Sequence, residues 1–163
     1  AAPAREHGSE RLRLAATMLA LASMQIEPNI RLPQAISWAL QKRWIAISSA
    51  ERAMMAAAIA ANGNQLDLDD RVVALASESA LDEAIKWGLA IRLARRLGAL
   101  SRRSLNMSRL MIEKDALVLR LAASHAALNG GPVEKDMKLL AGRLGLSPRV
   151  NIVPDDALRS GEN

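Results

Sequence analysis

Residues 105–121 have the sequence LNMSRLMIEKDALVLRL, and here the spacing of apolar residues changes from one typical of helices to one typical of strands. Segments 105–112 and 117–121 predict two strands on either side of a turn at 113–115. In the second strand leucine occupies every other position, which is the alternation expected of a half-buried strand. The sequence therefore predicts a β-hairpin that begins shortly after residue 104.

The residues after this hairpin predict one more helix and one more strand. Gly130-Gly131-Pro132 is typical of a helix start, and the apolar face that follows keeps helical spacing until Gly145. Residues 149–153 predict a third strand. We therefore expect residues 104–153 to form a small β-β-α-β unit, followed by a polar, flexible tail over 154–163.

The residues before the hairpin predict a helical bundle over about residues 1–100. Apolar residues recur at helical spacing from Ser9, and we expect Pro28 to end that helix. Pro33 is placed to occupy the first turn of a second helix. The predicted fold class is thus mainly α: a helical bundle followed by a small α+β unit.

Two further helices of this bundle have recognisable ends. Ser48 and Glu51 have the spacing of a capping box, ahead of an alanine-rich run that Gly63 ends. Ser79 has capping spacing for a long helix over 81–97. Because that helix is apolar nearly all round, we expect it to be the most enclosed one.

The composition excludes several classes of protein. Half of the 163 residues are hydrophobic, with 31 alanines, 25 leucines and three tryptophans as the only aromatic residues. This composition favours helices over an all-β fold and is too apolar for a disordered chain. The absence of cysteine excludes disulfides and thiol catalysis and fits a cytoplasmic protein. The chain has no apolar run long enough to span a membrane and does not begin with Met, so we expect a piece of a longer protein.

The sequence offers no recognisable catalytic or metal site. Its two histidines, His7 and His125, do not belong to any recognisable ligand set, whereas a metal site usually needs three or four converging ligands. The Gly-x-Ser-x-Gly and phosphate-loop motifs are absent. The acidic cluster at 67–70 fits the start of a helix, which attracts acids. We therefore predict no catalytic residue, no metal ligand and no cofactor in this chain.

A basic segment over 84–112 is the strongest indication of a binding function. It contains seven Lys or Arg residues and no acidic residue, in a chain of net charge +5. The planar guanidinium group suits phosphate oxygens, and a strip of arginines can hold a polyanion without reading any sequence. The alternative is a solvated helix end, where cations interact favourably with the helix dipole. The candidate anion contacts on this segment are Arg92, Arg95, Arg96, Arg102 and Arg103.

Several short motifs are spread along the chain, and the similarity that they carry by their order and spacing extends over most of it. They are EHGSERL at 6–12, EPNIR at 27–31, ERA at 51–53, LAIRLA at 89–94 and LAGRLGL at 140–146. Together they resemble the C-terminal region of the exopolyphosphatase / guanosine pentaphosphate phosphatase (Ppx/GppA) family, most like an alphaproteobacterial-type member. Arg31, Arg52 and Arg92 match the pattern of that family and are added as anion-contact candidates.

The resemblance implies an HD-like helical domain over 1–100 that belongs to a longer enzyme. In that family an N-terminal actin-like module carries catalysis with magnesium and releases phosphate from inorganic polyphosphate, and that module is absent from this chain. The C-terminal region helps subunits to pair and holds long polyphosphate chains. The resemblance thus implies an accessory domain in a cytoplasmic homodimer, whose partners are the catalytic module and polyphosphate.

The chain departs from the family at polar positions of the HD-like pocket. Aligned on the motifs, a common Asp falls at Leu21, a common His at Glu27, a second His at Ser49, and an Arg-Tyr pair at Ala61-Asn62. Leu21 cannot bind a metal, and an HD phosphohydrolase needs imidazole and carboxylate ligands. The resemblance therefore implies a degenerate pocket without catalysis of its own.

Three alternative functions stay open from the sequence. A metal-dependent HD-type phosphohydrolase would need a divalent ion near Glu27 or His7. A purely structural dimerisation domain would place Trp38 or Trp44 in an apolar subunit contact. Loose nucleic-acid binding is a weaker hypothesis, because the chain has few aromatic residues on which bases could stack.

Overall fold

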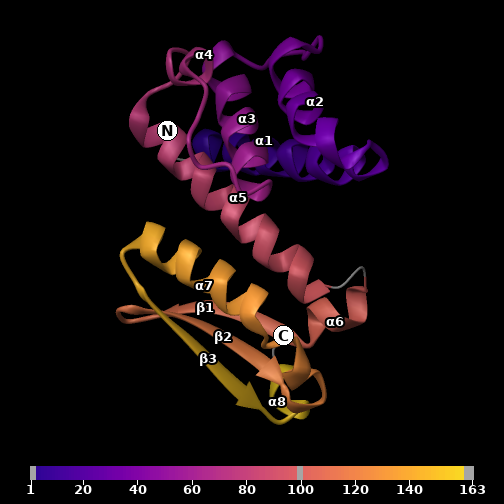
Figure 1. Ribbon diagram of the computed structural model, residues 1–163. Helices are drawn as coiled ribbons and strands as arrows, with labels where there is room; N and C mark the ends of the chain where they lie inside the picture. The colour runs from indigo at the N-terminus through magenta and orange to yellow at the C-terminus, as the bar shows by residue number, and fades with distance from the viewer. Residues whose placement is uncertain (1–2, 99–100, 160–163) are drawn as a thin grey trace. The chain divides into compact units, whose positions relative to one another are not determined.

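A computed structural model describes residues 3–98 and 101–159, apart from the side chains of residues 3–9, 102, 103 and 159. Internal contacts divide the chain into two compact units, Ala1–Ile91 and Arg92–Asn163. The boundary lies inside a long helix, whereas the sequence analysis placed it after that helix, near residue 100. Figure 1 labels the helices of the first unit and the sheet of the second.

The described part of the first unit contains helices joined by loops and no strand, as the sequence predicted. None of the described helices is both long and apolar enough to cross a membrane. The elements are α1 (Pro3–Ala22), the short 3-10 helix η1 (Ser23–Gln25), α2 (Pro28–Gln41), α3 (Ser49–Asn62), α4 (Asp70–Val73) and α5 (Glu78–Gly98), which continues into the second unit.

The two prolines of α2 do not lie where the sequence analysis placed them. Pro28 is the first residue of α2 and does not end α1, which already stops at Ala22. A proline fits there because the first N–H groups of a helix have no partner within the helix. Pro33 lies inside α2, beyond the first turn, where it removes one main-chain hydrogen bond.

The predicted capping box at the start of α3 is confirmed. The Glu51 N–H donates to Ser48 Oγ at 3.2 Å, and the Ser48 N–H donates to Glu51 Oε2 at 2.7 Å. This hydrogen bond from the Ser48 backbone is the main cause that lowers the pKa of Glu51. Gly63 follows as the residue that caps the other end of α3, as predicted.

The most enclosed helix of the described chain is α3, and the expectation that 81–97 would be is wrong. Eight of the residues between Ala53 and Ala61 are buried, and most of them are alanines. Alanine lets neighbouring helices approach closely, so α3 packs against both α1 and α2. By contrast, α5 exposes residues such as Glu83 and Arg96 along its length.

The start of α5 also differs from the prediction, because Ser77 caps it in place of Ser79. The Ala80 N–H donates to Ser77 Oγ at 3.2 Å. Further along, Gly88 is buried against α3, where a Cβ atom would lie 2.7 Å from the Ala61 Cβ and would also collide with the Ala58 carbonyl oxygen. Only a glycine allows this approach of the two helices.

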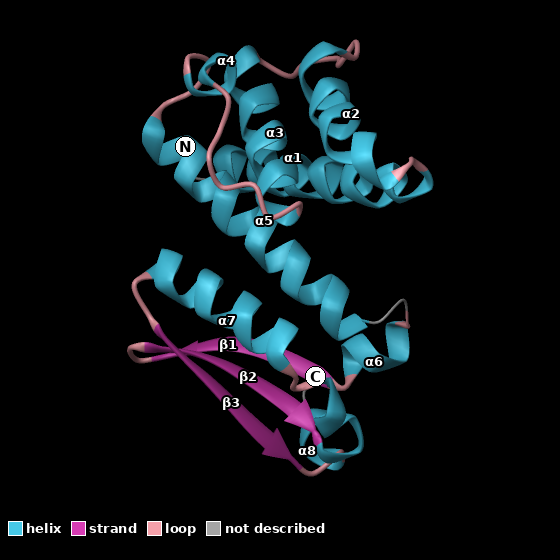
Figure 2. Cartoon of the chain, in the orientation of Figure 1, coloured by secondary structure: helices cyan, strands magenta, loops and turns pink. Residues whose placement is uncertain are grey.

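The second unit confirms the predicted β-β-α-β order. Its described strands form one sheet in the order β1-β2-β3, antiparallel between β1 and β2 and parallel between β2 and β3, and Figure 2 shows β2 in the middle. The fold class, mainly α followed by a small α+β unit, is therefore confirmed. The elements after α5 are α6 (Arg102–Asn106), β1 (Ser108–Glu113), β2 (Ala116–Ala122), η2 (Ala123–Leu128), α7 (Gly131–Leu144), β3 (Ser147–Val153) and α8 (Asp156–Arg159).

The central strand β2 is buried on both sides, so the expectation of a half-buried strand is wrong. Its leucines belong to the apolar face of the sheet, which we assign to the side that α7 covers. On the opposite face Val118 is also buried, with Met111 and Arg149 as its cross-strand neighbours. Because that face also carries Arg109 and Arg120, we call it the arginine face.

Two segments are more helical than the sequence suggested. Leu105 lies in α6, so β1 begins only at Ser108. The expected loose tail forms α8 over 156–159, because Leu158 is buried in a cluster with Met107 and Ala122. One apolar residue thus fixes this part of the tail, and residues 160–163 lie outside the described chain.

Gly88 and Gly142 provide a matched test of helix packing. We expect Gly88→Ala to destabilise the chain by roughly 1–3 kcal/mol, because the new methyl group meets backbone atoms of α3. Gly142→Ala, at an exposed position of α7 with nothing within 4 Å, is expected to stabilise it by about 0.5–1 kcal/mol. Urea unfolding followed by circular dichroism measures both. Equal effects of the two substitutions would contradict the close approach of α5 to α3.

Candidate functional site

The predicted arginine strip of α5 is held by a buried carboxylate. Asp136 of α7 is only 1 % exposed, and it accepts hydrogen bonds on both oxygens. Arg92 Nε donates to Oδ1 at 2.7 Å, and Arg96 Nε donates to Oδ2. Arg92 and Arg96 thus share one partner that is 44 and 40 residues away in sequence.

This arrangement gives two of the predicted anion contacts a structural role. A carboxylate in an apolar interior needs both a counter-charge and hydrogen bonds, and the two guanidinium groups supply them. The Arg92 side chain is only 14 % exposed, whereas that of Arg96 is 39 % exposed. Their first function is therefore to hold α7 against the end of α5, and the charge available to a ligand is reduced accordingly.

Arg52 caps the C-terminal end of α2. Its Nη1 donates to the carbonyl oxygens of Leu40 and Lys42, both at 3.0 Å. The indole Nε1 of Trp44 donates to the carbonyl oxygens of Trp38 and Ala39 at 3.2 and 3.0 Å. These donors satisfy the last carbonyls of a helix that no glycine follows.

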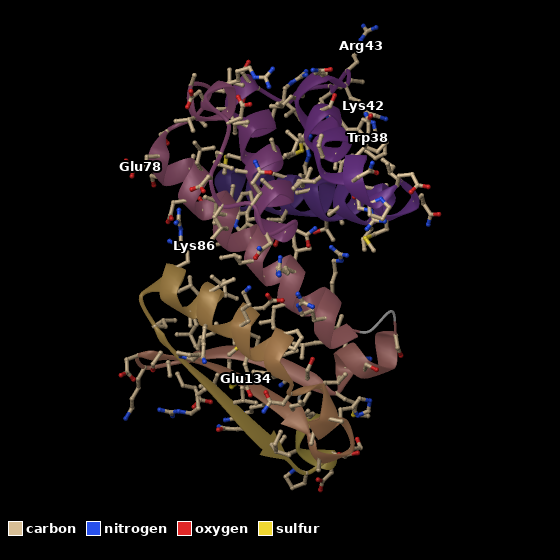
Figure 3. The ribbon with its side chains drawn as sticks, viewed as in Figure 1. Trp38, Lys42, Arg43, Glu78, Lys86 and Glu134 are labelled. Carbon is tan, nitrogen blue, oxygen red and sulfur yellow. The ribbon has the colours of Figure 1, made fainter. Side chains whose placement is uncertain are left out.

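Trp38 lies in the last part of α2, close to this cap, and is half-buried. Lys42 Nζ lies 4.9 Å from the centre of the Trp38 ring, a cation–π contact. Figure 3 shows Trp38, Lys42 and Arg43 at this end of α2, with the Arg43 side chain directed away from the protein. Trp44 thus donates hydrogen bonds to the backbone of α2, and Trp38 contacts a lysine of the same unit.

Arg31 has a comparable role at the end of η1. Its Nε and Nη2 donate to the Ile26 carbonyl at 3.2 and 3.0 Å, and Nη2 also donates to the Met24 carbonyl at 3.3 Å. Arg31 and Arg52 therefore serve different backbone carbonyls within the first unit. The structure gives neither of them an arrangement typical of a phosphate site.

The remaining predicted contacts lie in the second unit. Arg95 is half-buried on α5. Arg102 and Arg103 begin α6, and their side chains fall outside the described residues. The anion-binding role of these three residues remains a prediction.

The arginine face of the sheet offers charges that the sequence analysis did not select. The register places Arg109 of β1 directly opposite Arg120 of β2, and Arg149 of β3 opposite Val118. Arg109 and Arg149 are exposed. Arg120 Nη2 lies 2.9 Å from Glu113 Oε1, the one acidic side chain that the three described strands carry. Three arginines and one glutamate leave this face with an excess of positive charge.

One sequence signal indicated part of this surface. Arg120 alternates with the leucines of β2, so it must lie on the face opposite to them. Its neighbours Arg109 and Arg149 could not be placed beside it from sequence, because that requires the register of three strands.

A groove of about 720 Å³ opens in the first unit between α2, α3 and α4. Its charged lining residues are already paired: Arg52 with the carbonyls at the end of α2, and Asp69 with Arg71. Asp69 Oδ1 accepts from Arg71 Nε at 3.0 Å and from the Arg71 N–H at 2.9 Å. The Arg71 side chain is the main cause that lowers the pKa of Asp69 to about 2. The groove therefore lacks a carboxyl group that could exchange protons near neutral pH.

The positions that the family resemblance assigns to an HD-like pocket do not converge. Ser49 begins α3 and Ala61 lies near its end, so the rise of the helix separates them by about 18 Å. Leu21 is exposed on α1, and Glu27 is exposed just before α2. These four positions therefore do not surround one cavity.

No metal centre is visible in the described residues. No three His, Asp or Glu side chains among them are grouped so that they could hold a metal ion. His125 lies in η2, where its Nδ1 is 2.9 Å from Ser124 Oγ. The side chain of His7 lies outside the described residues.

Comparison with known proteins adds no relative. No protein-family model matches the chain, and a search of curated proteins finds no match. What the site can bind must therefore be inferred from the residues described above.

The buried ion pair gives the sharpest test of this site. We expect Asp136→Ala to destabilise the chain by about 3–5 kcal/mol, because it leaves two guanidinium groups without their counter-charge. As a control, Asp82→Ala removes the partly exposed ion pair that Asp82 forms with Lys86 within α5. This substitution should cost less than about 1 kcal/mol. Chemical unfolding measures both variants, and similar losses for the two would contradict the structural role of Asp136.

Proposed function

We propose that this chain is a non-catalytic accessory domain of a cytoplasmic exopolyphosphatase-like enzyme. It pairs two subunits and holds inorganic polyphosphate near a separate catalytic module. That module, with its magnesium, would release phosphate. The carrying observation is the arginine face, on which Arg109, Arg120 and Arg149 outnumber Glu113.

The arginine face has the chemistry that a polyanion requires. Its guanidinium groups project from three adjacent strands, which lie roughly 5 Å apart. Guanidinium groups bind phosphate oxygens by charge and by paired N–H donors. A polyphosphate chain has no bases to read, so a surface without stacking aromatics suits it better than a nucleic acid.

Support for a larger parent protein comes from an apolar stripe on α1. Leu14, Met18 and Leu21 are 61 %, 61 % and 47 % exposed. Their spacing puts them on one side of the helix. A stripe of this kind on a surface helix fits contact with another protein body. In our proposal, the catalytic module of the parent chain packs against this stripe.

A titration with medium-chain inorganic polyphosphate tests the anion part of this proposal. We expect binding at low salt whose affinity falls as salt rises, because phosphate contacts release counterions. The variant Arg120→Ala/Arg149→Ala should bind more weakly and lower the salt slope by about 1 for each phosphate contact that it removes.

Lys42→Ala/Arg43→Ala is the matched control, since it removes the same charge from exposed residues of the first unit. It should bind almost as well as the natural chain. Equal losses of polyphosphate affinity in both variants would show that binding depends only on the net charge of the chain. Absence of binding at low salt would leave a purely structural pairing domain.

A further inference from the structure

The strand β1 is an open edge of the sheet in the described chain. The strand order β1-β2-β3 leaves one side of β1 without a neighbouring strand. Its sequence, SRLMIE, has no proline or lysine, and it pairs with β2 without a bulge. Leu110 and Ile112 on this strand are 38 % and 60 % exposed. A strand edge whose backbone N–H and C=O groups are unpaired is a template for pairing with another strand.

The backbone groups that β1 directs outward can be identified. The Ala122 N–H donates to the Met107 carbonyl at 3.0 Å, which makes this pair a hydrogen-bonded one. In an antiparallel ladder such pairs alternate, so Arg109 and Met111 also bond to β2. It follows that Leu110 and Ile112 turn their N–H and C=O groups toward the open edge.

We propose that β1 pairs antiparallel with β1 of a second copy of this chain, around a two-fold axis at Met111. The two sheets then form one continuous sheet of six strands. This surface deepens the pairing part of the proposed function and rests on it. In this register Leu110 is opposite Ile112 of the second copy, and these residues exchange the inter-strand hydrogen bonds.

The same register matches charge as well as apolar surface. Arg109 of each copy lies opposite Glu113 of the other, and both side chains are on the arginine face. Opposite charges in directly facing cross-strand positions are stabilising. A register shifted so that Leu110 faces its own equivalent would place Arg109 opposite Met111 and lose both ion pairs. The sequence of β1 is therefore self-complementary in one register.

The pairing also relieves a repulsion inside each copy. Arg109 and Arg120 are directly opposite on the same face, and like charges in that position are destabilising. Glu113 of the second copy would lie on the other side of Arg109. Glu113 keeps its contact with Arg120, so each of the two rows across the seam would hold Arg120 and Arg109 of one copy and Glu113 of the other. A second copy of this chain is thus the occupant that the charges of β1 favour.

Charge reversal tests the register. We expect the natural chain to dimerise, and both Arg109→Glu and Glu113→Arg to weaken the dimer by about tenfold or more, because each places two like charges opposite each other. A mixture of the two variants should form a heterodimer, since one chain then carries two Glu and the other two Arg. The doubly reversed chain Arg109→Glu/Glu113→Arg should pair with itself again. Sedimentation velocity over a concentration series measures the natural chain, the three variants and the mixture.

Lys138→Glu and Glu134→Lys serve as controls on the exposed side of α7. They make the same charge changes away from β1 and should leave dimerisation unchanged. A monomeric natural chain, or dimers that resist both reversals, would overturn the β1 surface. Either result can coexist with salt-dependent polyphosphate binding, so failure of this surface is distinguishable from failure of the accessory function.

A single introduced cysteine tests the position of the axis. The chain contains no cysteine, so Met111→Cys would meet only its equivalent in the second copy. Facing residues of a non-hydrogen-bonded antiparallel pair have Cα atoms about 4.5 Å apart, which a disulfide can bridge. We expect oxidation to give a covalent dimer for Met111→Cys and none for Asn151→Cys on β3. Equal cross-linking of both would contradict the proposed axis.

Discussion

The buried carboxylate of Asp136 is the constraint around which the second unit is built. It is one of few charged groups that the described chain places in its interior, and both of its oxygens are held by guanidinium groups. The boundary between the two compact units falls between Ile91 and Arg92, at the first of these arginines. The last turns of α5 therefore belong with the sheet because their arginines bond to α7. Removing Asp136 leaves two guanidinium groups without their counter-charge, which costs more than the intact triad contributes.

The same constraint explains why the order of elements could be predicted and the role of the arginines could not. Helix and strand boundaries follow from local spacing, caps and glycines, as the capping box at Ser48 shows. An ion pair between residues 44 positions apart leaves no local signal. Asp136 lies beside Met137, on the apolar face that the sequence assigned to α7, and a carboxylate in that position was the available hint. The register that aligns Arg109 with Arg120 also depends on packing that sequence alone does not give.

Long side chains cap helices in this alanine-rich chain. Lys42 and Arg43 follow α2 where a glycine would usually end it. The carbonyls there are satisfied by Trp44 and Arg52 instead, and Arg31 performs the same task after η1. This use explains why residues that match a family pattern need not bind a ligand. Where no glycine ends a helix, the last carbonyl groups need other hydrogen-bond donors, and here arginine and tryptophan side chains supply them.

The two proposed surfaces are coupled through one residue, since Arg109 belongs to both the arginine face and the edge of β1. Each copy contributes a net charge of +2 to that face from three arginines and one glutamate. Pairing across the edge would join two such faces into one surface of six strands. A polyanion that crosses the seam would contact both copies, and its apparent affinity would rise without any new contact within a copy. By linkage, the same ligand would favour the paired state by an equal factor. Pairing of subunits and retention of a long phosphate chain would then be two consequences of a single edge strand.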